Sequence, residues 1–236
     1  MPVDKREPRI QQMFGEIAPR YDRMNHLLSL NVDRYWRWRT VRILNPGDEL
    51  PILDVCTGTG DMALAFCRRV RGRVPVIGTD FCPEMLEVGE QKRLQAGIGS
   101  QLTFLQADTQ QLPFAANHFQ LVTAAFGLRN VADTQAGLRE MVRVCAPGGR
   151  VGILEFSVPR RQPMRGLYGL YFRYVLPRIG QLLAANSHDA YRYLPESVRE
   201  FATGEALIQL LLQAGLNQVE GRALTGGIAT LYVGTK

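Results

Sequence analysis

From about residue 50 onward, short runs of almost uninterrupted apolar residues recur along the chain, separated by longer mixed segments. Apolar runs of this length are typical of strands buried on both faces of a sheet. The mixed segments carry helix signals, such as Asp61 and Pro83 in a first turn and APGG just past an end. The pattern predicts strands at 51–56, 74–80, 102–108, 118–126, 150–156, 216–224 and 228–234, and helices at 60–70, 82–95, 134–145 and 204–215.

The order of these elements predicts the fold class. Strands that alternate with helices indicate an α/β fold with a doubly wound, mostly parallel sheet of seven strands, which binds ligands at the carboxyl ends of its strands. The last two strands are joined by TGG, which predicts a C-terminal antiparallel hairpin. We expect a single domain over 1–236, with a helical N-terminal cap at 1–46 and a core at 47–236 that contains a cap insertion near 160–200.

Composition leaves several partners open. The 236 residues carry a formal net charge of +6, which permits an anionic partner such as nucleic acid, a membrane surface or an acidic substrate, as well as a mildly basic enzyme. The four cysteines form no C-x-x-C pair, so their spacing predicts neither a zinc site nor a disulfide framework, and no metal is expected. The first residues do not resemble a signal peptide and no run of about 18 apolar residues occurs, so a cytoplasmic protein is expected.

A glycine loop lies between the first predicted strand and the first predicted helix, in ILDVCTGTGD (52–61). Gly58, Gly60 and Ala63 fit G-x-G-x-x-G/A, and Asp80 stands about 20 residues further on, which matches a dinucleotide fingerprint. An acid at the end of the second strand binds ribose hydroxyls in more than one ligand class. The glycines alone therefore do not choose the ligand.

Other acids separate the alternatives. Asp54 lies four residues before Gly58 and Asp61 opens the next helix, and a carboxylate beside a pyrophosphate is repelled by roughly 1 to 4 kcal/mol at close range. S-adenosylmethionine carries an ammonium and a sulfonium and no phosphate, so it reverses that sign. The alternative is that Asp54 only caps the loop. Asp54, Asp80 and Asp108 stand at three successive strand ends and match the aminoacyl, ribose and adenine parts of one nucleoside, which favours S-adenosylmethionine as the cofactor.

Four segments resemble one protein family. They are YDRMNHLLSLNVDRYWRWR (21–39), LDVCTGTGD (53–61), FGLRNV (126–131) and RVCAPGGRVGILEFSVP (143–159). They are similar to the signatures of the class I S-adenosylmethionine-dependent methyltransferases and, more narrowly, of the C-methyltransferases of menaquinone and ubiquinone biosynthesis. The resemblance covers nearly the whole chain. It implies a Rossmann-like methyltransferase fold and a cofactor site formed by Asp54, Gly58, Thr59, Gly60, Asp80, Asp108, Thr109 and Ala125.

The resemblance also implies a reaction. The expected enzyme transfers a methyl group to a ring carbon of a prenylated or phytylated naphthoquinol, converting demethylmenaquinol to menaquinol or 2-phytyl-1,4-naphthoquinol to phylloquinol; the segment AYRYLPESVREF (190–201) suggests the phylloquinone type. The alternatives are a benzoquinol C-methyltransferase of the ubiquinone pathway and a nucleic-acid methyltransferase. Against the latter, AAFGLRN (124–130) stands where amino-directed enzymes of that class carry [DNS]-P-P-[YFW]. The partner implied is a lipophilic quinol with an isoprenoid tail, not nucleic acid.

Three departures from the family pattern stand near the expected site. Cys56 replaces the first glycine of the general D-x-G-x-G-x-G loop, and Asn31-Val32-Asp33 replaces a frequent Gly-x-His or Gly-x-Gln step. Ala125 stands where some members carry a serine, so any contact there is expected to come from the backbone.

Catalytic candidates follow from the chemistry of a quinol. Arg129 is expected to lower the pKa of a quinol hydroxyl and to stabilise the oxyanion, with a supporting salt bridge as the alternative. Asp22 is expected to accept the hydroxyl proton and Tyr21 to pack on the ring, with a structural role in the cap as the alternative for each. The weaker candidates are Asn25, His26, Asn130 and His188.

Two segments outside the alternation, 8–44 and 163–185, are expected to cover the carboxyl edge of the sheet. The second is rich in leucine and tyrosine, which fits a helix packed on the core, a groove for the tail, or a peripheral contact with membrane in which Arg165, Arg173 and Arg178 meet lipid phosphates. A homodimer is also compatible with the sequence.

Overall fold

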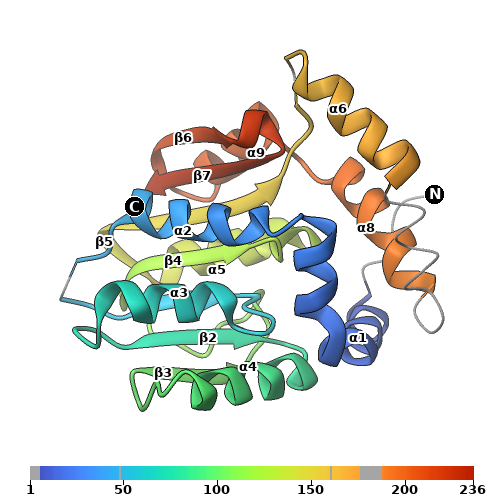
Figure 1. Cartoon of the computed structure of the whole chain (residues 1–236). Helices are drawn as coiled ribbons and strands as arrows, with labels where there is room; N and C mark the ends of the chain where they lie inside the picture. Colours follow the sequence, from blue (N-terminus) through green and yellow to red (C-terminus); the bar gives the residue numbers. More distant parts are fainter. Residues whose placement is uncertain (1–5, 48, 160, 176–187) are drawn as a thin grey trace.

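The seven predicted strands form one sheet in a computed structural model that describes residues 6–47, 49–159, 161–175 and 188–236 (Figure 1). The strand order is β3-β2-β1-β4-β5-β7-β6; the first five in this order are parallel, and β7 is antiparallel to both of its neighbours. The predicted fold class is confirmed. The strands are β1 (Ile52–Val55), β2 (Val76–Asp80), β3 (Leu102–Gln106), β4 (Phe119–Ala125), β5 (Cys145–Phe156), β6 (Asn217–Leu224) and β7 (Ala229–Thr235).

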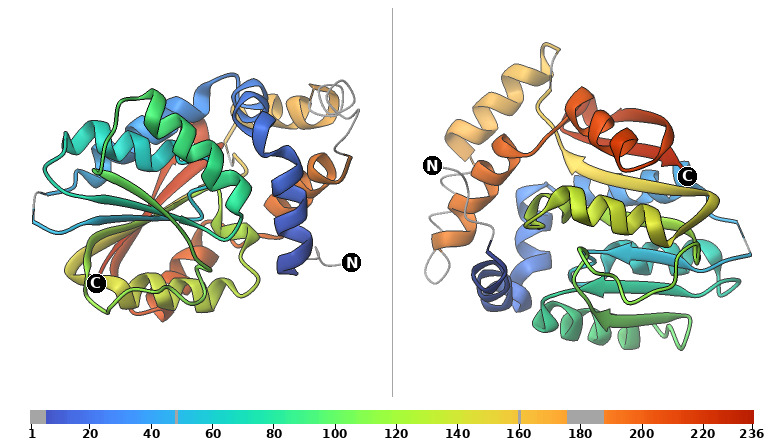
Figure 2. Two further views of the ribbon diagram at one scale, coloured as in Figure 1. Left: turned by 90° about the horizontal axis from the view of Figure 1, so that it is seen from below. Right: turned by 180° about the vertical axis from the view of Figure 1, so that it is seen from behind.

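Helices cover both faces of this sheet (Figure 2). On one face lie α2 (Val32–Leu44), α3 (Asp61–Val70) and α4 (Pro83–Gln95), and on the other α5 (Thr134–Val144) and α9 (Glu205–Gln213). Apolar side chains of the strands alternate between these two faces, so Ile52 packs in one core with Phe66 and Leu53 packs in the other with Leu138. Short helical turns complete the described chain at η1 (Leu128–Asn130), η2 (Tyr171–Val175) and η4 (Thr225–Gly227).

Three helices gather at the carboxyl ends of the strands (Figure 1): α1 (Glu7–Leu28), α6 (Met164–Leu170) and α8 (His188–Glu200). The predicted helical segment 8–44 thus divides into two helices with different positions. Only α1 covers the carboxyl edge, whereas α2 lies on a sheet face because Trp36 and Leu44 are buried in the same core as Ile52. Residues 176–185 of the second predicted covering segment, with Arg178, lie outside the described residues.

The segment APGG differs from the prediction of a stop and turn. Helix α5 does end at Val144, but β5 begins at Cys145 rather than at 150, with a register shift against β4. The chain end holds this segment extended, because Gly148 donates its N–H to the carbonyl of Lys236, and Lys236 donates in return to Gly149. Among the described helices, none combines the length and hydropathy needed to cross a membrane.

Candidate active site

The glycine loop connects the carboxyl end of β1 to α3. Gly58 and Gly60 have φ values of +56° and +79°, and a Cβ on Gly60 would come within 2.4 Å of the ring of Phe104, so only glycine fits there. Two of the loop N–H groups are used inside the protein: Thr57 donates to the carbonyl of Thr79 (2.9 Å) and Gly60 to that of Thr57 (2.9 Å). They are therefore not free to bind a pyrophosphate.

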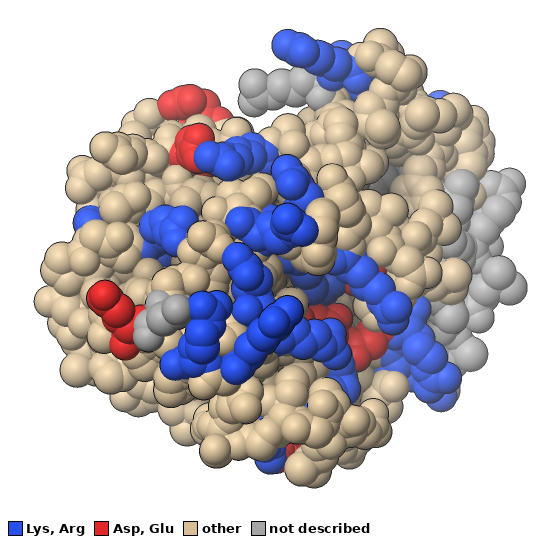
Figure 3. All heavy atoms as spheres, turned by 60° about the vertical axis from the view of Figure 1, so that its left-hand side comes forward, with Lys and Arg blue, Asp and Glu red and all other residues tan. Residues whose placement is uncertain are grey.

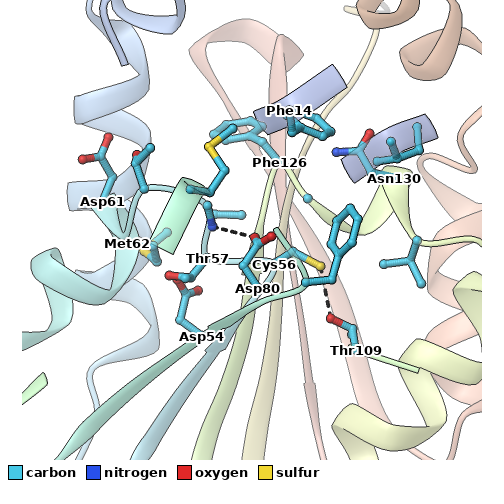
Figure 4. Close-up of a pocket in the computed structure, with 18 of the residues that line it drawn as sticks. Phe14, Asp54, Cys56, Thr57, Asp61, Met62, Asp80, Thr109, Phe126 and Asn130 are labelled. Carbon is cyan, nitrogen blue, oxygen red and sulfur yellow. Dashed lines mark hydrogen bonds between the residues drawn. The ribbon is translucent and has the colours of Figure 1, made fainter. Parts of the chain in front are cut away.

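Two buried carboxylates support the loop (Figure 4). Asp80 accepts from the backbone N–H of Gly58 (2.8 Å) and of Cys82 (3.0 Å). Asp54 accepts from the hydroxyls of Thr57 (2.6 Å) and Thr123 (2.7 Å). Burial raises the pKa of both Asp54 and Asp80 to about 6, because a charged carboxylate loses its hydration there. A nearby positive charge would therefore stabilise the ionised form of each carboxyl group.

The remaining predicted cofactor residues lie around the cavity that Asp54 and Asp80 line, the first of two at this edge of the sheet. Asp108 lies two residues beyond the end of β3 and accepts from the backbone N–H of Gln110 (2.9 Å), and Thr109 Oγ1 lies 3.2 Å from the sulfur of Cys56. Asp108 and Thr109 line this first cavity, as do Asp54, Thr57, Gly58, Thr59, Asp61, Asp80 and Ala125. Phe14, Phe126 and Asn130 border it on the side away from the two buried acids (Figure 4).

The charges of this first cavity fit S-adenosylmethionine. Four carboxylates line it, and Arg37 is the one cation among its described lining residues. Such a donor set suits a nucleoside that carries an ammonium, a sulfonium and one carboxylate, and it repels a diphosphate. The residues present therefore fit this cofactor, with Asp54 and Asp80 beneath the loop and Arg37 matched to the carboxylate.

The raised pKa values predict a pH-dependent cofactor affinity. A cationic ligand prefers ionised Asp54 and Asp80, so binding of S-adenosylmethionine is expected to weaken by about tenfold for each coupled group as the pH falls from 7 to 5. The stability of the ligand-free protein depends on pH in the opposite direction. The contribution of these two carboxyl groups to the free energy of unfolding is fully present below about pH 4 and is lost as the pH rises through about 6. Calorimetric titration checks this, with adenosine as the control, because adenosine keeps the ribose expected at Asp80 but lacks the cationic aminoacyl chain expected at Asp54. An equal pH dependence for adenosine would contradict the assignment.

A charged link ties the N-terminal cap to the loop. Asp22 of α1 accepts from the hydroxyl of Thr59 (2.5 Å) and from Lys92 of α4 (2.7 Å). Lys92 also contacts Asp61, which opens α3. Asp22 lines neither of the two cavities at this edge of the sheet, and its carboxylate contacts the loop and α4.

A second cavity adjoins the first and is mainly apolar. Tyr21, Arg37 and Phe126 line both cavities and form a wall between them. The second cavity has a volume of about 270 Å³ and extends between α1, α2 and α6. Its further lining residues include Leu28, Leu30, Val32, Trp36, Phe156, Met164, Leu167, Tyr168, Tyr171 and Ile228.

Arg129, in η1 just after β4, also lines this second cavity. It forms a buried ion pair with Glu155 (3.3 Å), donates to the carbonyl of Phe126 and lies over the ring of Phe156 at 5.4 Å from its centroid. Its Nε is buried and has no hydrogen-bond partner among the described residues. Arg129 therefore carries one buried donor that is unsatisfied among the described residues.

Tyr21 faces both cavities, and Asn25 lines the second. Burial raises the pKa of Tyr21, and the charge of Arg129 opposes that shift. The other candidates lie differently. His26 points its Nδ1 at Asp33 (2.9 Å), Asn130 accepts from the hydroxyl of Tyr193 (3.0 Å), and the side chain of His188 lies outside what the structure describes.

Two site residues were missed at the sequence level. Glu155 lies inside an apolar strand run, and Arg37 is one of several arginines on one helix, so neither stands out in the sequence. Arg37 pairs with Asp33 (2.5 Å) and approaches Asp61 (3.8 Å). The potential ligand atoms of His26, Asp33 and Asp61 lie within 4.8 Å of one another, but the pairing of both acids with Arg37 opposes a metal ion there.

Comparison with known proteins identifies the family. Residues 3–236 match the ubiE/COQ5 methyltransferase family. The chain belongs to that family. It is 41% identical to a demethylmenaquinone methyltransferase of Bacteroides fragilis, over 98% of this chain and 94% of that one. It is 43% identical to a ubiquinone/menaquinone biosynthesis C-methyltransferase UbiE of Geobacter sp. (strain M21), over 99% of both chains. The predicted S-adenosylmethionine-dependent methyltransferase of this family is confirmed.

Solved structures agree with the fold. A methyltransferase from Aquifex aeolicus superposes with a TM-score of 0.61 at 16% identity, covering 90% of this chain and 96% of that chain. The [4+2]-cyclase SpnF superposes equally well, with a TM-score of 0.64 at 18% identity, over 100% of this chain and 98% of that chain. Proteins with different activities thus share this fold, and the acceptor of this methyltransferase has to be argued from its second cavity.

Proposed function

We propose that this methyltransferase methylates a ring carbon of a reduced naphthoquinone that carries an isoprenoid tail. The observation that carries the proposal is the mainly apolar second cavity, which shares Tyr21, Arg37 and Phe126 with the cofactor cavity and has two guanidinium groups, those of Arg37 and Arg129, in its lining. An aromatic ring next to the shared wall lies beside the methyl donor, and apolar side chains of α1 and α6 suit a hydrocarbon tail. The names of the relatives support the same acceptor class.

The proposed acceptor is the quinol, because a quinone ring is electron-poor. When bound, S-adenosylmethionine supplies an electrophilic methyl group on a positively charged sulfur. Arg129 and Arg37 line the acceptor cavity and are proposed to lower the pKa of the quinol hydroxyl, so that its proton passes to water and the oxyanion places charge on the adjacent ring carbon. Once that carbon has taken the methyl group, its own proton would also pass to water and the ring would become aromatic again. Asp22, paired with Thr59 and Lys92, is proposed to position the cap instead of accepting that proton.

Tyr21 is proposed to donate a hydrogen bond to the quinol oxygen while its ring packs on the acceptor. Tyr21→Phe is expected to lower kcat by about a hundredfold, the usual effect of losing one donor to an oxyanion, with little change in cofactor affinity. Tyr21→Ala is expected to raise KM for the quinol as well, because it also removes the shared wall. Steady-state kinetics with a reduced naphthoquinol checks both. Normal turnover in Tyr21→Phe would show that the hydroxyl plays no part.

The decisive experiment is methyl transfer from labelled S-adenosylmethionine to reduced quinols. We expect transfer to naphthoquinols with polyprenyl or phytyl tails, slower transfer to a benzoquinol and none to the oxidised quinones. The relative rates with the two tails separate a menaquinone enzyme from a phylloquinone enzyme. Transfer to the benzoquinol alone would show that the enzyme acts in the ubiquinone pathway. Transfer to nucleic acid and to none of the quinols would refute the proposal.

The proposal includes the partners. A lipophilic quinol is the substrate, nucleic acid is not, and the enzyme contacts the membrane from one side while it exchanges substrate and product. The exposed Leu167 and Leu170 of α6 support such a contact, since large apolar side chains rarely remain in water without a function when they cluster. Light scattering in solution tests whether the enzyme acts as a homodimer.

A further inference from the structure

An exposed stripe of arginine and aromatic side chains runs along α2. Trp38 lies four residues after Arg34, three after Tyr35 and four before Arg42, so these four side chains share one face of the helix. Tyr35 and Trp38 are 47% and 49% exposed, with ring centroids 6.0 Å apart, and the guanidinium of Arg42 lies 4.9 Å from the centroid of the Trp38 ring. The cofactor and acceptor cavities do not use these four side chains.

The stripe belongs to a strongly basic face. Helix α3, which packs beside α2, ends with the exposed Arg68 and Arg69. The two helices contain a single acid each, Asp33 and Asp61, both in the first turn and both close to Arg37. Figure 3 shows lysines and arginines collected into a band across this side of the molecule, with few acids between them. The face therefore attracts an extended anionic partner.

Four exposed leucines, the leucine rim, line the second cavity or stand next to one of its lining residues in the chain. Leu27, in the last turn of α1, and Leu30, between α1 and α2, are 49% and 69% exposed. Leu167 and Leu170 of α6 are exposed as well, and Leu30 and Leu167 both line the cavity. The hydroxyl of Tyr171 donates to the carbonyl of Leu28 (2.5 Å), which holds the two sides of this rim together.

We propose that the stripe and the leucine rim form one docking face for a bilayer that contains anionic phospholipids. The arginines match lipid phosphates, tyrosine and tryptophan suit the interface between headgroups and acyl chains, and leucines enter the acyl region. Nucleic acid would use the arginines and the rings but not the leucines, so the rim favours a lipid surface. The inference rests on the proposed function in one respect: docking places the cavity mouth against the phase in which a quinol with an isoprenoid tail dissolves.

Vesicle flotation tests the charge. Wild-type enzyme is expected to float with vesicles of phosphatidylcholine and phosphatidylglycerol at low salt, and to bind much less to phosphatidylcholine alone or at high salt. Arg34→Glu with Arg42→Glu is expected to weaken binding by at least about twentyfold, since each arginine near an anionic surface contributes about a factor of five. Arg139→Glu is the control for a charge reversal elsewhere on the surface, because Arg139 is exposed on α5 at the opposite face of the sheet.

Tryptophan fluorescence tests the contact itself. The chain has two tryptophans, and Trp36 is buried and donates to Thr225 (2.8 Å), so an environmental change on binding reports Trp38. A blue shift on addition of anionic vesicles is expected in the wild type and is expected to vanish in Trp38→Phe. A shift that persists in that variant would overturn the assignment of the stripe.

Methyl transfer to a short-tailed naphthoquinol in solution separates this inference from the proposed function. The variant with both arginines replaced is expected to keep wild-type turnover there and to lose it with a long-tailed quinol in anionic vesicles, which also shows that it is folded. Absence of wild-type flotation at low salt, equal loss in Arg139→Glu, or displacement of bound enzyme from vesicles by equimolar duplex DNA would each overturn the docking face. In all three cases turnover of the short-tailed quinol would still stand as support for the reaction.

Discussion

Replacing Arg129 with methionine is expected to lower turnover by about a thousandfold and the free energy of unfolding by about 3 to 5 kcal/mol. The loss of stability arises because Glu155, 1% exposed, would remain buried without its counter-charge. The loss of turnover arises because the quinol oxyanion would lose a guanidinium in the acceptor cavity. Urea denaturation and methyl-transfer kinetics measure the two effects.

A second substitution separates these effects. Arg129→Met combined with Glu155→Gln removes the unpaired charge and keeps an acceptor for one of the two backbone N–H groups, those of Arg129 and Phe156, that bond to different oxygens of Glu155, so part of the stability is expected to return. Turnover is expected to stay low, while affinity for S-adenosylmethionine changes little because Arg129 does not line the first cavity. If the double variant regains wild-type turnover, Arg129 acts only as the partner of Glu155 and the proposed contact with the acceptor is wrong.

Asp80→Ala is expected to weaken binding of S-adenosylhomocysteine by about a hundredfold or more, because it removes charge-assisted hydrogen bonds at the base of the loop. The carboxylate fixes the N–H groups of Gly58 and Cys82, so its removal leaves two donors without their acceptor and deprives the ribose of its expected partner. Asp80→Asn keeps one acceptor oxygen and is expected to lie between the wild type and alanine. Isothermal titration measures the affinities.

Asp133→Ala is the matched control. Asp133 also accepts from a backbone N–H, that of Ala136 (2.9 Å), but it caps α5 and lines neither cavity. Its removal is expected to cost about 1 kcal/mol of stability without changing cofactor affinity. Equal affinity loss in both variants would mean that the effect of Asp80 is general destabilisation, and unchanged affinity in Asp80→Ala would remove Asp80 from the site.

The sheet was predictable because its information is local. Each central strand is a continuous apolar run with turn residues beside it, and parallel strands leave their last residues at one edge, so the sequence alone predicts that Asp54, Asp80 and Asp108 meet there. Cys56 shows where this local information ends. It adopts φ of +48° at a position where glycine is usual, and the backbone of Gly127 leaves the space, since a Cβ there would lie 2.4 Å from that of Cys56.

The acceptor side was less predictable because its contacts join distant segments. The pairing of Asp22 with Lys92 spans 70 residues, and that of Arg129 with Glu155 joins the ends of two strands. Periodicity places each of these residues on an element but does not pair them. Arg37 lines both cavities because the chain turns sharply before α2, where Asn31 adopts φ of +62°. No pattern in the sequence predicts this turn.

The two cavities share a wall formed by Tyr21, Arg37 and Phe126, so a single ligand can be designed to bind in both. A molecule that joins an adenosine to a hydroxynaphthalene through a linker passing these side chains would occupy both sites at once. Its second half would bind at a local concentration in the millimolar range, so two weak ligands could give a tight inhibitor. Enzymes that share the fold and bind the same nucleoside but lack the second cavity would bind only the adenosine part of such a molecule, and bind it weakly. Selectivity would therefore come from the wall and the second cavity and not from the cofactor site.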